Sequence, residues 1–597
     1  MVTQPIVAAE SRTKLTFAGA LLAWFLFLLL TALAIFELKA PNPLPITAPQ
    51  TDFSAERALA HVRAMARAPH PIGSSAEQLT RDYVVSQLSA LGMNPQVFSA
   101  IGIRSNKNFV IAGYTSDILG RLPGTANSKA VVLMAHYDSV PSGPGAADDT
   151  AGVAAILETI RALRAGPALR NDIIVLITDG EEAGLLGAEA FAASHPWMRD
   201  VGVILNFEAR GNQGPSLLFE TSANNAALIK EAAAGAPYVT GSSLFYSLYK
   251  LLPNDTDVTI FRATKTPALN FAFGEHLEAY HSMLDTPDNL SLSSLQHHGS
   301  NALGLARQFG GIDLNELKKQ KGDDIFFNWF GSHLVAYSER WVPIGEIIVS
   351  LILASIIFVS WRRGTLGLRS FWGLLAALLI TLAIPFGMVI AAWPLLKSLK
   401  GRMVVGDASP NALLLAGLVL LGTAAGTAIF AGLRRQVKLQ ELSVAGLLLV
   451  CLLSWTSALL LPAGSYLLFW PLLFSSAGLL LLAIDRQSAT PARVGASMAP
   501  ATVATILLFA PVAYLLYVFL TLNVVSVAAI GLLLSLGFLL CIPAMDMVIP
   551  PDRWKSVTLL LLLGAGICLG IGAVRSHSSA AHPKKDSLVY ASNYDMR

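Results

Sequence analysis

The chain has 597 residues, more than one ordinary soluble domain contains, so we expect at least two structural units. Hydrophobic residues make up 54% of the chain and charged residues only 14%, and the apolar excess is concentrated in one N-terminal stretch and towards the C-terminus, as is typical of a membrane protein. The net charge of +3 is small for this length and no Lys/Arg stripe accompanies it, which argues against nucleic acid as a partner.

The first predicted element is a transmembrane helix at residues 17–36, which carry no charge and are long enough to cross a bilayer core of about 30 Å. A secretory signal peptide is the alternative, but its apolar region usually has only about 7–15 residues, and the following residues 37–40 form a poor cleavage site. We therefore predict a cytoplasmic N-terminus at residues 1–16 and a retained membrane anchor.

The next segment, residues 40–320, is predicted to be a domain outside the membrane. Residues 74–77, Ser-Ser-Ala-Glu, fit a capping box before a helix that runs to Leu91. Short aliphatic runs then alternate with helical patterns, at residues 130–138, 173–179, 201–208 and 267–273. Near-continuous apolar strands separated by helices predict an α/β fold with a mixed, mainly parallel sheet and helices on both faces.

Polar residues that bind metals in other proteins follow each of these predicted strands. They are His136 and Asp138 after the first strand, Glu181 and Glu182 after the second, Glu208 at the end of the third and His281 beyond the fourth. Ligands of open α/β sheets bind at the carboxyl ends of the strands, so these side chains can converge on one site.

Each of these residues also has a simpler interpretation. A single histidine at a strand end is often structural, and two glutamates there are typical of a solvated helix N-terminus. The pair Asp148-Asp149, which precedes the helical pattern TAGVAAILETI, is also typical of an N-cap. The prediction of a site therefore rests on their shared position at one edge of the sheet.

A set of two histidines and three carboxylates drawn from these residues would supply nitrogen and oxygen ligands. Such ligands suit zinc, with cobalt or manganese as alternatives. One catalytic zinc usually keeps three protein ligands and an open position, so five ligands are too many for one ion. They suffice for two ions if one carboxylate bridges them. Two metals about 3.5–4 Å apart can hold a hydroxide and polarise a carbonyl group.

Five blocks of this sequence resemble the co-catalytic di-zinc peptidases of clan MH, a family that includes secreted bacterial aminopeptidases. The blocks are AHYDSVPSGPGAADD, DGEEAGLLGAEAF, NFEARG, LPNDTDVTIF and YHSMLDTPDNL, within residues 50–315. The order of one helix, an outer protease domain and a helical bundle is similar to the membrane-bound branch that contains endoplasmic-reticulum metallopeptidases and vacuolar membrane proteases. The resemblance implies a zinc aminopeptidase-like fold for this domain.

The resemblance also implies a ligand set for two zinc ions: His136 and Glu208 on one ion, Glu182 and His281 on the other, and Asp148 bridging the two. It further implies that Asp138 orients His136 and that Asp149 is a cap or supporting residue. Ala147 stands where the family commonly has Asn or Asp, a departure that removes no ligand.

Four further residues are candidates by resemblance or position. Glu181 matches the general base that takes a proton from the attacking water. Tyr280 matches a tyrosine that hydrogen-bonds the developing oxyanion, with a rim aromatic as the alternative. Asp257 aligns with a block near the site, with a capping role as the alternative, and Arg210 is a candidate to contact a substrate carboxylate, with an ion pair as the alternative. Five further histidines are expected to be surface or structural residues: His70, His195, His276, His297 and His298.

After residue 340 the apolar runs return and predict an eight-helix transmembrane domain at residues 342–574, with one of the eight at 371–396. Two uncharged stretches are each twice as long as one crossing, and they are expected to break at 461–464 and near Asn523. Basic residues in most of the short loops fall on the side of the N-terminus, although the loop at 397–402 and the tail depart from this rule. The peptidase domain and the tail at 575–597 are therefore expected on the extracytoplasmic side.

The three cysteines, Cys451, Cys541 and Cys568, all fall within the predicted membrane helices. The outer domain therefore has no cysteine for a disulfide, a metal site or a nucleophile.

These features predict a membrane-anchored zinc exopeptidase, an aminopeptidase, that acts on peptides at the surface of a lipid bilayer. The expected location is a bacterial inner membrane with a periplasmic peptidase domain, and a eukaryotic endomembrane with a lumenal domain is the alternative. The sequence leaves the oligomeric state open.

Two other functions are alternatives to this prediction. A glutaminyl cyclase of the same fold resembles a one-zinc version of the site, and the retention of His136 and Glu208 argues against it. A non-catalytic peptide-binding or transport scaffold is opposed by the retention of Glu181 and of every ligand. Glu346 is the only clear acid within the predicted membrane helices, whereas transporters typically have more.

Overall fold

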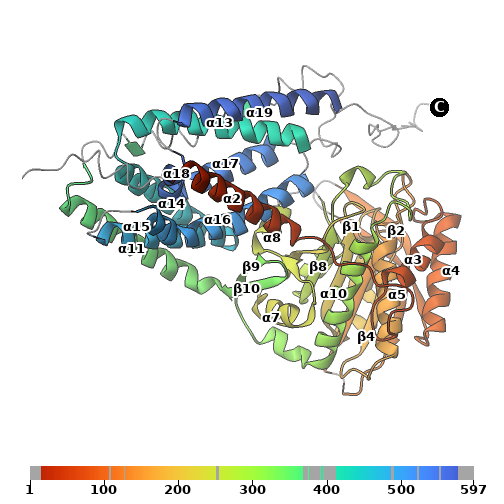
Figure 1. Ribbon diagram of the computed structural model, residues 1–597. Helices are drawn as coiled ribbons and strands as arrows, with labels where there is room; N and C mark the ends of the chain where they lie inside the picture. Colours follow the sequence, from red (N-terminus) through yellow and green to blue (C-terminus); the bar gives the residue numbers. More distant parts are fainter. Residues whose placement is uncertain are drawn as a thin grey trace, which may run out of the picture.

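The computed structural model describes residues 15–105, 109–126, 128–250, 254–367, 412–485, 490–520, 524–549 and 553–575, together with single positions between 374 and 394. Within these ranges the chain forms an α/β domain and a bundle of long apolar helices, which lie side by side (Figure 1). The predictions for the N-terminal residues before 15, for most of the helix at 371–396 and for the tail after residue 575 lie outside the described residues.

The α/β domain contains one eight-stranded sheet. Its strands are β1 (Gln96–Ser105), β2 (Val110–Leu122), β3 (Ala130–His136), β4 (Ile173–Thr178), β5 (Val201–Ala209), β6 (Leu217–Thr221), β7 (Thr240–Gly241) and β8 (Ala268–Phe273). Their spatial order is β1-β2-β4-β3-β5-β8-β6-β7. The central strands β4, β3, β5 and β8 run parallel, and the pairs β1–β2, β2–β4 and β8–β6 are antiparallel. The predicted mixed α/β sheet is thereby confirmed.

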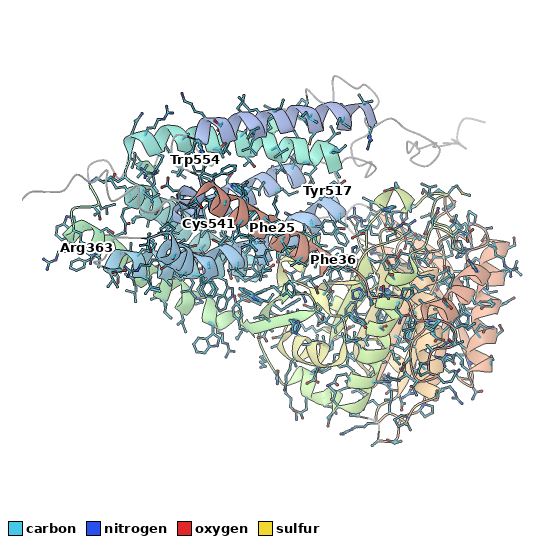
Figure 2. The ribbon with its side chains drawn as sticks, viewed as in Figure 1. Phe25, Phe36, Arg363, Tyr517, Cys541 and Trp554 are labelled. Carbon is cyan, nitrogen blue, oxygen red and sulfur yellow. The ribbon has the colours of Figure 1, made fainter. Side chains whose placement is uncertain are left out.

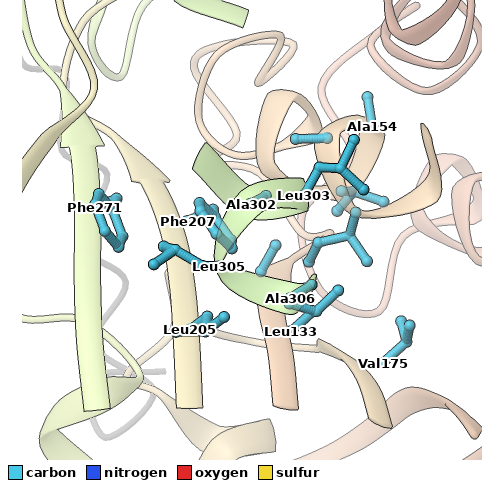
Figure 3. Packing of buried hydrophobic residues seen from close by; sticks show 14 of the residues in the cluster. Leu133, Ala154, Val175, Leu205, Phe207, Phe271, Ala302, Leu303, Leu305 and Ala306 are labelled. Atoms are coloured by element: carbon cyan, nitrogen blue, oxygen red, sulfur yellow. The ribbon is translucent and has the colours of Figure 1, made fainter. Parts of the chain in front are cut away.

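Helices cover both faces of this sheet. One face is covered by α3 (Ala55–Met65), α5 (Thr150–Arg164) and α10 (Leu292–Gly311), and the other by α6 (Leu186–Ser194) and α9 (Val258–Arg262). Alternate residues of a strand enter opposite cores, so Leu133 packs on the first face and Met134 on the second. Figure 3 shows Leu133, Leu205 and Phe271 of neighbouring strands beside Ala302 of α10. This double coverage is the reason why the central strands have continuous apolar sequences.

The predicted helix cap before α4 (Ser75–Ala90) is present in a shifted form. Ser74 is the N-cap, and its hydroxyl accepts a hydrogen bond from the Glu77 amide at 3.1 Å. The Glu77 carboxylate accepts from the Gly73 amide at 2.6 Å, one residue before the N-cap. Two backbone donors at the helix start are therefore satisfied.

The helical bundle is built from long apolar helices. They are α2 (Phe17–Phe36), α11 (Val342–Arg362), α13 (Ala412–Gln436), α14 (Leu439–Leu460), α15 (Tyr466–Ile484), α16 (Pro491–Leu520), α17 (Val524–Leu540), α18 (Ile542–Val548) and α19 (Trp554–Arg575). Among the described residues, seven helices are long and apolar enough to cross a membrane, and the pair α17 and α18, bent by 80°, counts as one further broken span. The protein is a membrane protein.

The predicted breaks between helices agree with this bundle. The short 3-10 helix η6 (Pro462–Gly464) separates α14 from α15, and α16 ends three residues before Asn523. Cys541 lies at the bend between α17 and α18, within the stretch that counts as one broken span. Figure 2 shows Arg363 at the end of the bundle that faces away from the α/β domain, and Phe36 at the end that faces it.

A hairpin that the sequence did not indicate connects the two bodies. Its strands are β9 (Asp324–Phe330) and β10 (His333–Ser338), which follow the predicted domain end at residue 320. Phe327 of β9 stacks on Tyr466 of α15 with ring centroids 4.3 Å apart. The Tyr466 hydroxyl in turn lies 2.6 Å from the Ser242 hydroxyl, next to α8 (Ser243–Tyr249). The α/β domain is thus packed onto the bundle and not only tethered to it.

Candidate active site

The predicted site residues meet at the carboxyl ends of the parallel strands. His136 is the last residue of β3, and Glu208 is the second-last residue of β5. Glu181 and Glu182 lie in the turn after β4, and His281 follows β8. Asp148 lies in the loop between β3 and α5. The fold therefore brings together side chains that are up to 145 positions apart in the sequence.

The five predicted ligands are arranged around Asp148. One carboxylate oxygen of Asp148 is 3.2 Å from His136 Nε2, and the other is 3.2 Å from His281 Nε2. His136 Nε2 is also 3.6 Å from a Glu208 oxygen, and His281 Nε2 is 3.1 Å from Glu182 Oε1. Asp148 therefore presents one oxygen to each of two histidine–carboxylate pairs.

The donor atoms fit a metal site. His281 Nε2 and Glu182 Oε1 are buried and form no hydrogen bond, although they are only 3.1 Å apart. Buried polar atoms are normally hydrogen-bonded, so two such atoms that face one point indicate a ligand between them. Nitrogen and carboxylate donors within 4.8 Å of one another also occur in two overlapping sets, His136-Asp148-Glu182 and His136-Asp149-Glu208. This donor set suits zinc.

The close contacts between these side chains shift the pKa values of Asp148 and His281. Burial would raise the pKa of Asp148, but its close contacts with the imidazole rings of His136 and His281 hold it at about 2. Burial would lower the pKa of His281, but its contacts with Asp148 and Glu182 raise it to about 9. The carboxylates are thus arranged to stabilise positive charge at this position, which a bound cation also supplies.

Asp138 has a wider structural role than the sequence suggested. Its side chain lies 3.4 Å from His136 Nδ1, as expected for a residue that orients the ring. Its two oxygens also accept hydrogen bonds from the backbone amides of Glu181 at 3.0 Å and Glu182 at 3.2 Å. One buried carboxylate therefore fixes a histidine on β3 and the turn after β4 relative to each other.

Asp149 differs from Asp148 in its contacts, as predicted. It is the N-cap of α5 and accepts from the Gly152 amide at 3.1 Å. Its other oxygen accepts from the His136 backbone amide at 3.3 Å. Burial and the charge of Glu208 raise the pKa of Asp149. Asp149 is therefore a cap that also supports His136.

Asp285 is a supporting residue that the sequence analysis missed. Its carboxylate accepts hydrogen bonds from the amides of Ala147 at 2.7 Å and Asp148 at 3.2 Å. The only sequence signal was its position four residues after His281 in the last block. With Ala147 in place of the polar residue common in the family, the loop around Asp148 is held through its backbone.

Glu181 has no ligand role in this geometry and lines the cavity beside the cluster. Burial raises its pKa well above the ordinary value, and the nearby charges of Glu208 and Asp257 act in the same direction. Glu181 is thus a partly buried carboxyl group in the cavity lining beside the ligand cluster.

Tyr280, the candidate oxyanion donor, and Arg210, the candidate substrate contact, both line the cavity. The Tyr280 ring stacks on the His281 ring with centroids 3.7 Å apart. Arg210 donates from Nη1 to the Phe519 carbonyl of α16 at 3.3 Å, and its Nε is buried without a hydrogen bond among the described residues. The contact of Arg210 in this structure is therefore a backbone carbonyl.

Asp257 lies outside the cavity lining. It accepts a hydrogen bond from the Thr178 hydroxyl at 2.5 Å, and its side chain makes no capping bond to α9. Burial raises the pKa of Asp257 to about 7. Asp257 thus occupies the N-cap position of α9 without a side-chain capping bond, and its hydrogen bond connects it to the end of β4.

The remaining histidines divide as expected into structural and surface residues. His70, His195, His297 and His298 are buried, and the His276 side chain is about half exposed. His70 is nearest to the site, since its amide donates to the Ser139 hydroxyl just after Asp138.

This fold and this cluster of nitrogen and carboxylate donors are similar to what a metallopeptidase domain needs. Residues 117–306 match the family model described as peptidase family M28, so this part of the chain is similar to the peptidases of that family. The predicted resemblance to a metallopeptidase family is confirmed over these residues.

Curated relatives share part of this chain. Endoplasmic reticulum metallopeptidase 1 of Rattus norvegicus is 28% identical over 378 residues, which cover 60% of this chain and 41% of that protein. A vacuolar membrane protease of Candida dubliniensis is 29% identical over 335 residues, 54% of this chain and 35% of that one. The matched region thus spans about two fifths or less of the length of these relatives.

Among solved structures, an aminopeptidase from Aneurinibacillus sp. strain AM-1 covers 44% of this chain and 95% of its own, with 14% identity and a TM-score of 0.36. A glutaminyl cyclase of Porphyromonas gingivalis covers 44% and 98%, with 19% identity and a TM-score of 0.35.

Proposed function

We propose that this protein is a membrane-anchored, zinc-dependent exopeptidase, specifically an aminopeptidase, whose site binds two zinc ions bridged by Asp148. The observation that carries the proposal is the position of Asp148, which offers one oxygen to the His136–Glu208 pair and the other to the His281–Glu182 pair. A shared carboxylate of this kind is what a two-metal hydrolase needs.

The side chains around the cavity have distinct tasks in this proposal. Bound zinc ions supply Lewis-acid polarisation of the scissile carbonyl and make a water molecule more acidic. Glu181 accepts a proton from the attacking water and returns it to the leaving amine. The Tyr280 hydroxyl donates to the oxygen on which negative charge develops. Asp138 holds His136 and the Glu181 turn in register through its three contacts.

The size of the cavity favours an exopeptidase. Its volume is about 270 Å³, below the usual range of roughly 300–1,000 Å³ for ligand pockets. Such a space suits a terminal residue better than a polypeptide that continues on both sides of the scissile bond. Arg210, with its buried unbonded Nε, is the proposed contact for a substrate carbonyl or carboxylate oxygen.

We also propose that the peptidase domain faces the extracytoplasmic side of its membrane. Arg363 lies at the opposite end of the bundle from this domain, as the distribution of basic residues requires (Figure 2). The names of the relatives refer to endoplasmic reticulum and vacuolar membranes, which favours an endomembrane over the bacterial inner membrane as the location.

The test uses the full-length protein in detergent with aminoacyl reporters and their N-acetylated counterparts. We expect cleavage of the free aminoacyl reporters, loss of activity with a chelator and recovery with zinc. Glu181→Gln should lower kcat by about 100- to 10,000-fold, because the proton acceptor is lost. Glu189→Gln, on the half-exposed side of α6, is the matched control and should retain activity.

Other outcomes have distinct meanings. Chelator-insensitive hydrolysis, or full activity of the Glu181→Gln variant, would contradict the metal mechanism. Cleavage of only the N-acetylated reporters would leave a peptidase but remove the aminopeptidase assignment. Conversion of an N-terminal glutamine to pyroglutamate without hydrolysis would instead identify a cyclase.

A further inference from the structure

One wall of the catalytic cavity belongs to a helix of the membrane bundle. The last turns of α16 contribute Leu515, Leu516 and Phe519 to the same cavity that Glu181 and Tyr280 line. Figure 2 labels Tyr517 in this part of α16, at the end of the bundle that faces the α/β domain. Residues more than 300 positions after Glu208 in the sequence therefore border the site.

This wall is fixed to the peptidase domain by contacts next to the proposed ligands. Arg210, two residues after Glu208, donates to the Phe519 carbonyl at 3.3 Å. The Tyr514 hydroxyl donates to the Glu275 carboxylate at 2.5 Å. The ring of Phe519 lies so close to Gly274 that a Cβ there would be 2.5 Å from it. The loops after β5 and β8 thus hold the end of α16 in place.

The side of the cavity away from the proposed ligands is mainly apolar. Next to α16, it is lined by Phe245 and Leu248 of α8 and by Leu217 and Phe219 of β6. The charged residues on this side, Arg104 and Asp255, form an ion pair with each other. A space that is enclosed by leucine and phenylalanine side chains, with its charges already paired, favours an apolar group.

We propose that the end of α16 forms the pocket for the substrate side chain beside the scissile bond, and that the enzyme prefers a large apolar residue such as Leu or Phe there. This inference rests on the proposed exopeptidase function and specifies its substrate class. It makes the membrane bundle a part of the substrate-binding site in addition to an anchor.

The test compares kcat/KM for alanyl, leucyl and phenylalanyl reporters in the full-length protein. The wild type should prefer the leucyl and phenylalanyl reporters over the alanyl reporter at least tenfold. Leu516→Trp, which fills the pocket, should reduce this leucyl-to-alanyl preference at least tenfold, mainly through KM. Leu516→Ala, which enlarges the pocket, should shift the preference from the leucyl to the phenylalanyl reporter.

Val503→Trp is the control on the same helix, because Val503 is 38% exposed on the bundle surface and does not line the cavity. It should leave the preference unchanged within about twofold. The inference is overturned if the Leu516 variants change kcat/KM for all three reporters equally, or if the wild type prefers the alanyl reporter. If Leu516→Trp fails to fold, Leu516→Ala alone decides the test. Absence of hydrolysis of every reporter by the wild type would overturn the proposed function as well, whereas hydrolysis without dependence on α16 would overturn only this inference.

Discussion

At the residue scale, two adjacent aspartates have different contacts and should have different effects when replaced. Asp148 faces both histidines, whereas Asp149 accepts backbone hydrogen bonds from Gly152 and His136. We predict that Asp148→Asn lowers kcat at least 100-fold, because the shared ligand is lost. Asp149→Asn should remain at least tenfold more active than Asp148→Asn and keep nearly the wild-type stability, because Asn caps a helix about as well as Asp, whereas Asp149→Ala should lose about 1 kcal/mol.

Steady-state kinetics and thermal unfolding of these variants, measured side by side, check this asymmetry. Equal activity losses in both Asn variants would show that the second aspartate is also a ligand.

At the element scale, β2 and the end of β4 are joined by two buried carboxylates. Asp117 accepts from the Asp179 amide at 3.0 Å, and Asp179 accepts from the Ser116 amide at 2.7 Å. Burial, with the charges of Glu77 and Asp138, raises the pKa of Asp179 to about 8, far above the value of about 3.9 in an unfolded chain. The folded state therefore holds a proton that the unfolded state releases between about pH 4 and pH 8.

The sign of this linkage gives a prediction. The contribution of Asp179 to stability is fully present below about pH 4 and is lost as the pH rises to about 8, by up to about 1.4 kcal/mol per pH unit. The unfolding temperature of the wild type should therefore fall between pH 5 and pH 8, and Asp179→Asn should flatten this decline. Differential scanning fluorimetry in detergent measures it, and a parallel decline in both proteins would be the opposite result.

The same scale shows which elements the sequence indicated. The strands β3, β4, β5 and β8 were predicted because burial on both faces makes their sequences continuously apolar. The strands β1 and β2 were missed, because most of their residues are partly or fully exposed and no apolar run marks them. The ligand residues were predicted because parallel strands end at one edge of the sheet.

Other features of the site follow from tertiary contacts. Asp285 supports the Asp148 loop through backbone amides, which leave no trace in a sequence pattern. Leu516 stands in an apolar run typical of any membrane helix, and nothing in that run indicates that the helix ends in a catalytic cavity. Local sequence periodicity predicts each helix or strand. The contact of Leu516 with the cavity depends instead on how the membrane bundle packs against the α/β domain.

At the scale of the whole molecule, the protein joins a domain that matches peptidase family M28 to a membrane bundle that borders the candidate site. The hairpin of β9 and β10, the α8 segment and the end of α16 all lie at this junction. The proposed pocket would therefore make substrate selection depend on the membrane part of the chain.

In the proposed mechanism, the peptidase domain uses two metal ions shared by Asp148. The most direct measurement is the zinc content of the purified full-length protein, determined by inductively coupled plasma mass spectrometry after dialysis against trace zinc, with activity followed as zinc is added back to the metal-free protein. We predict two zinc ions per chain, with full activity reached only when both are bound. One ion per chain at full activity, or full activity without metal, would contradict the account.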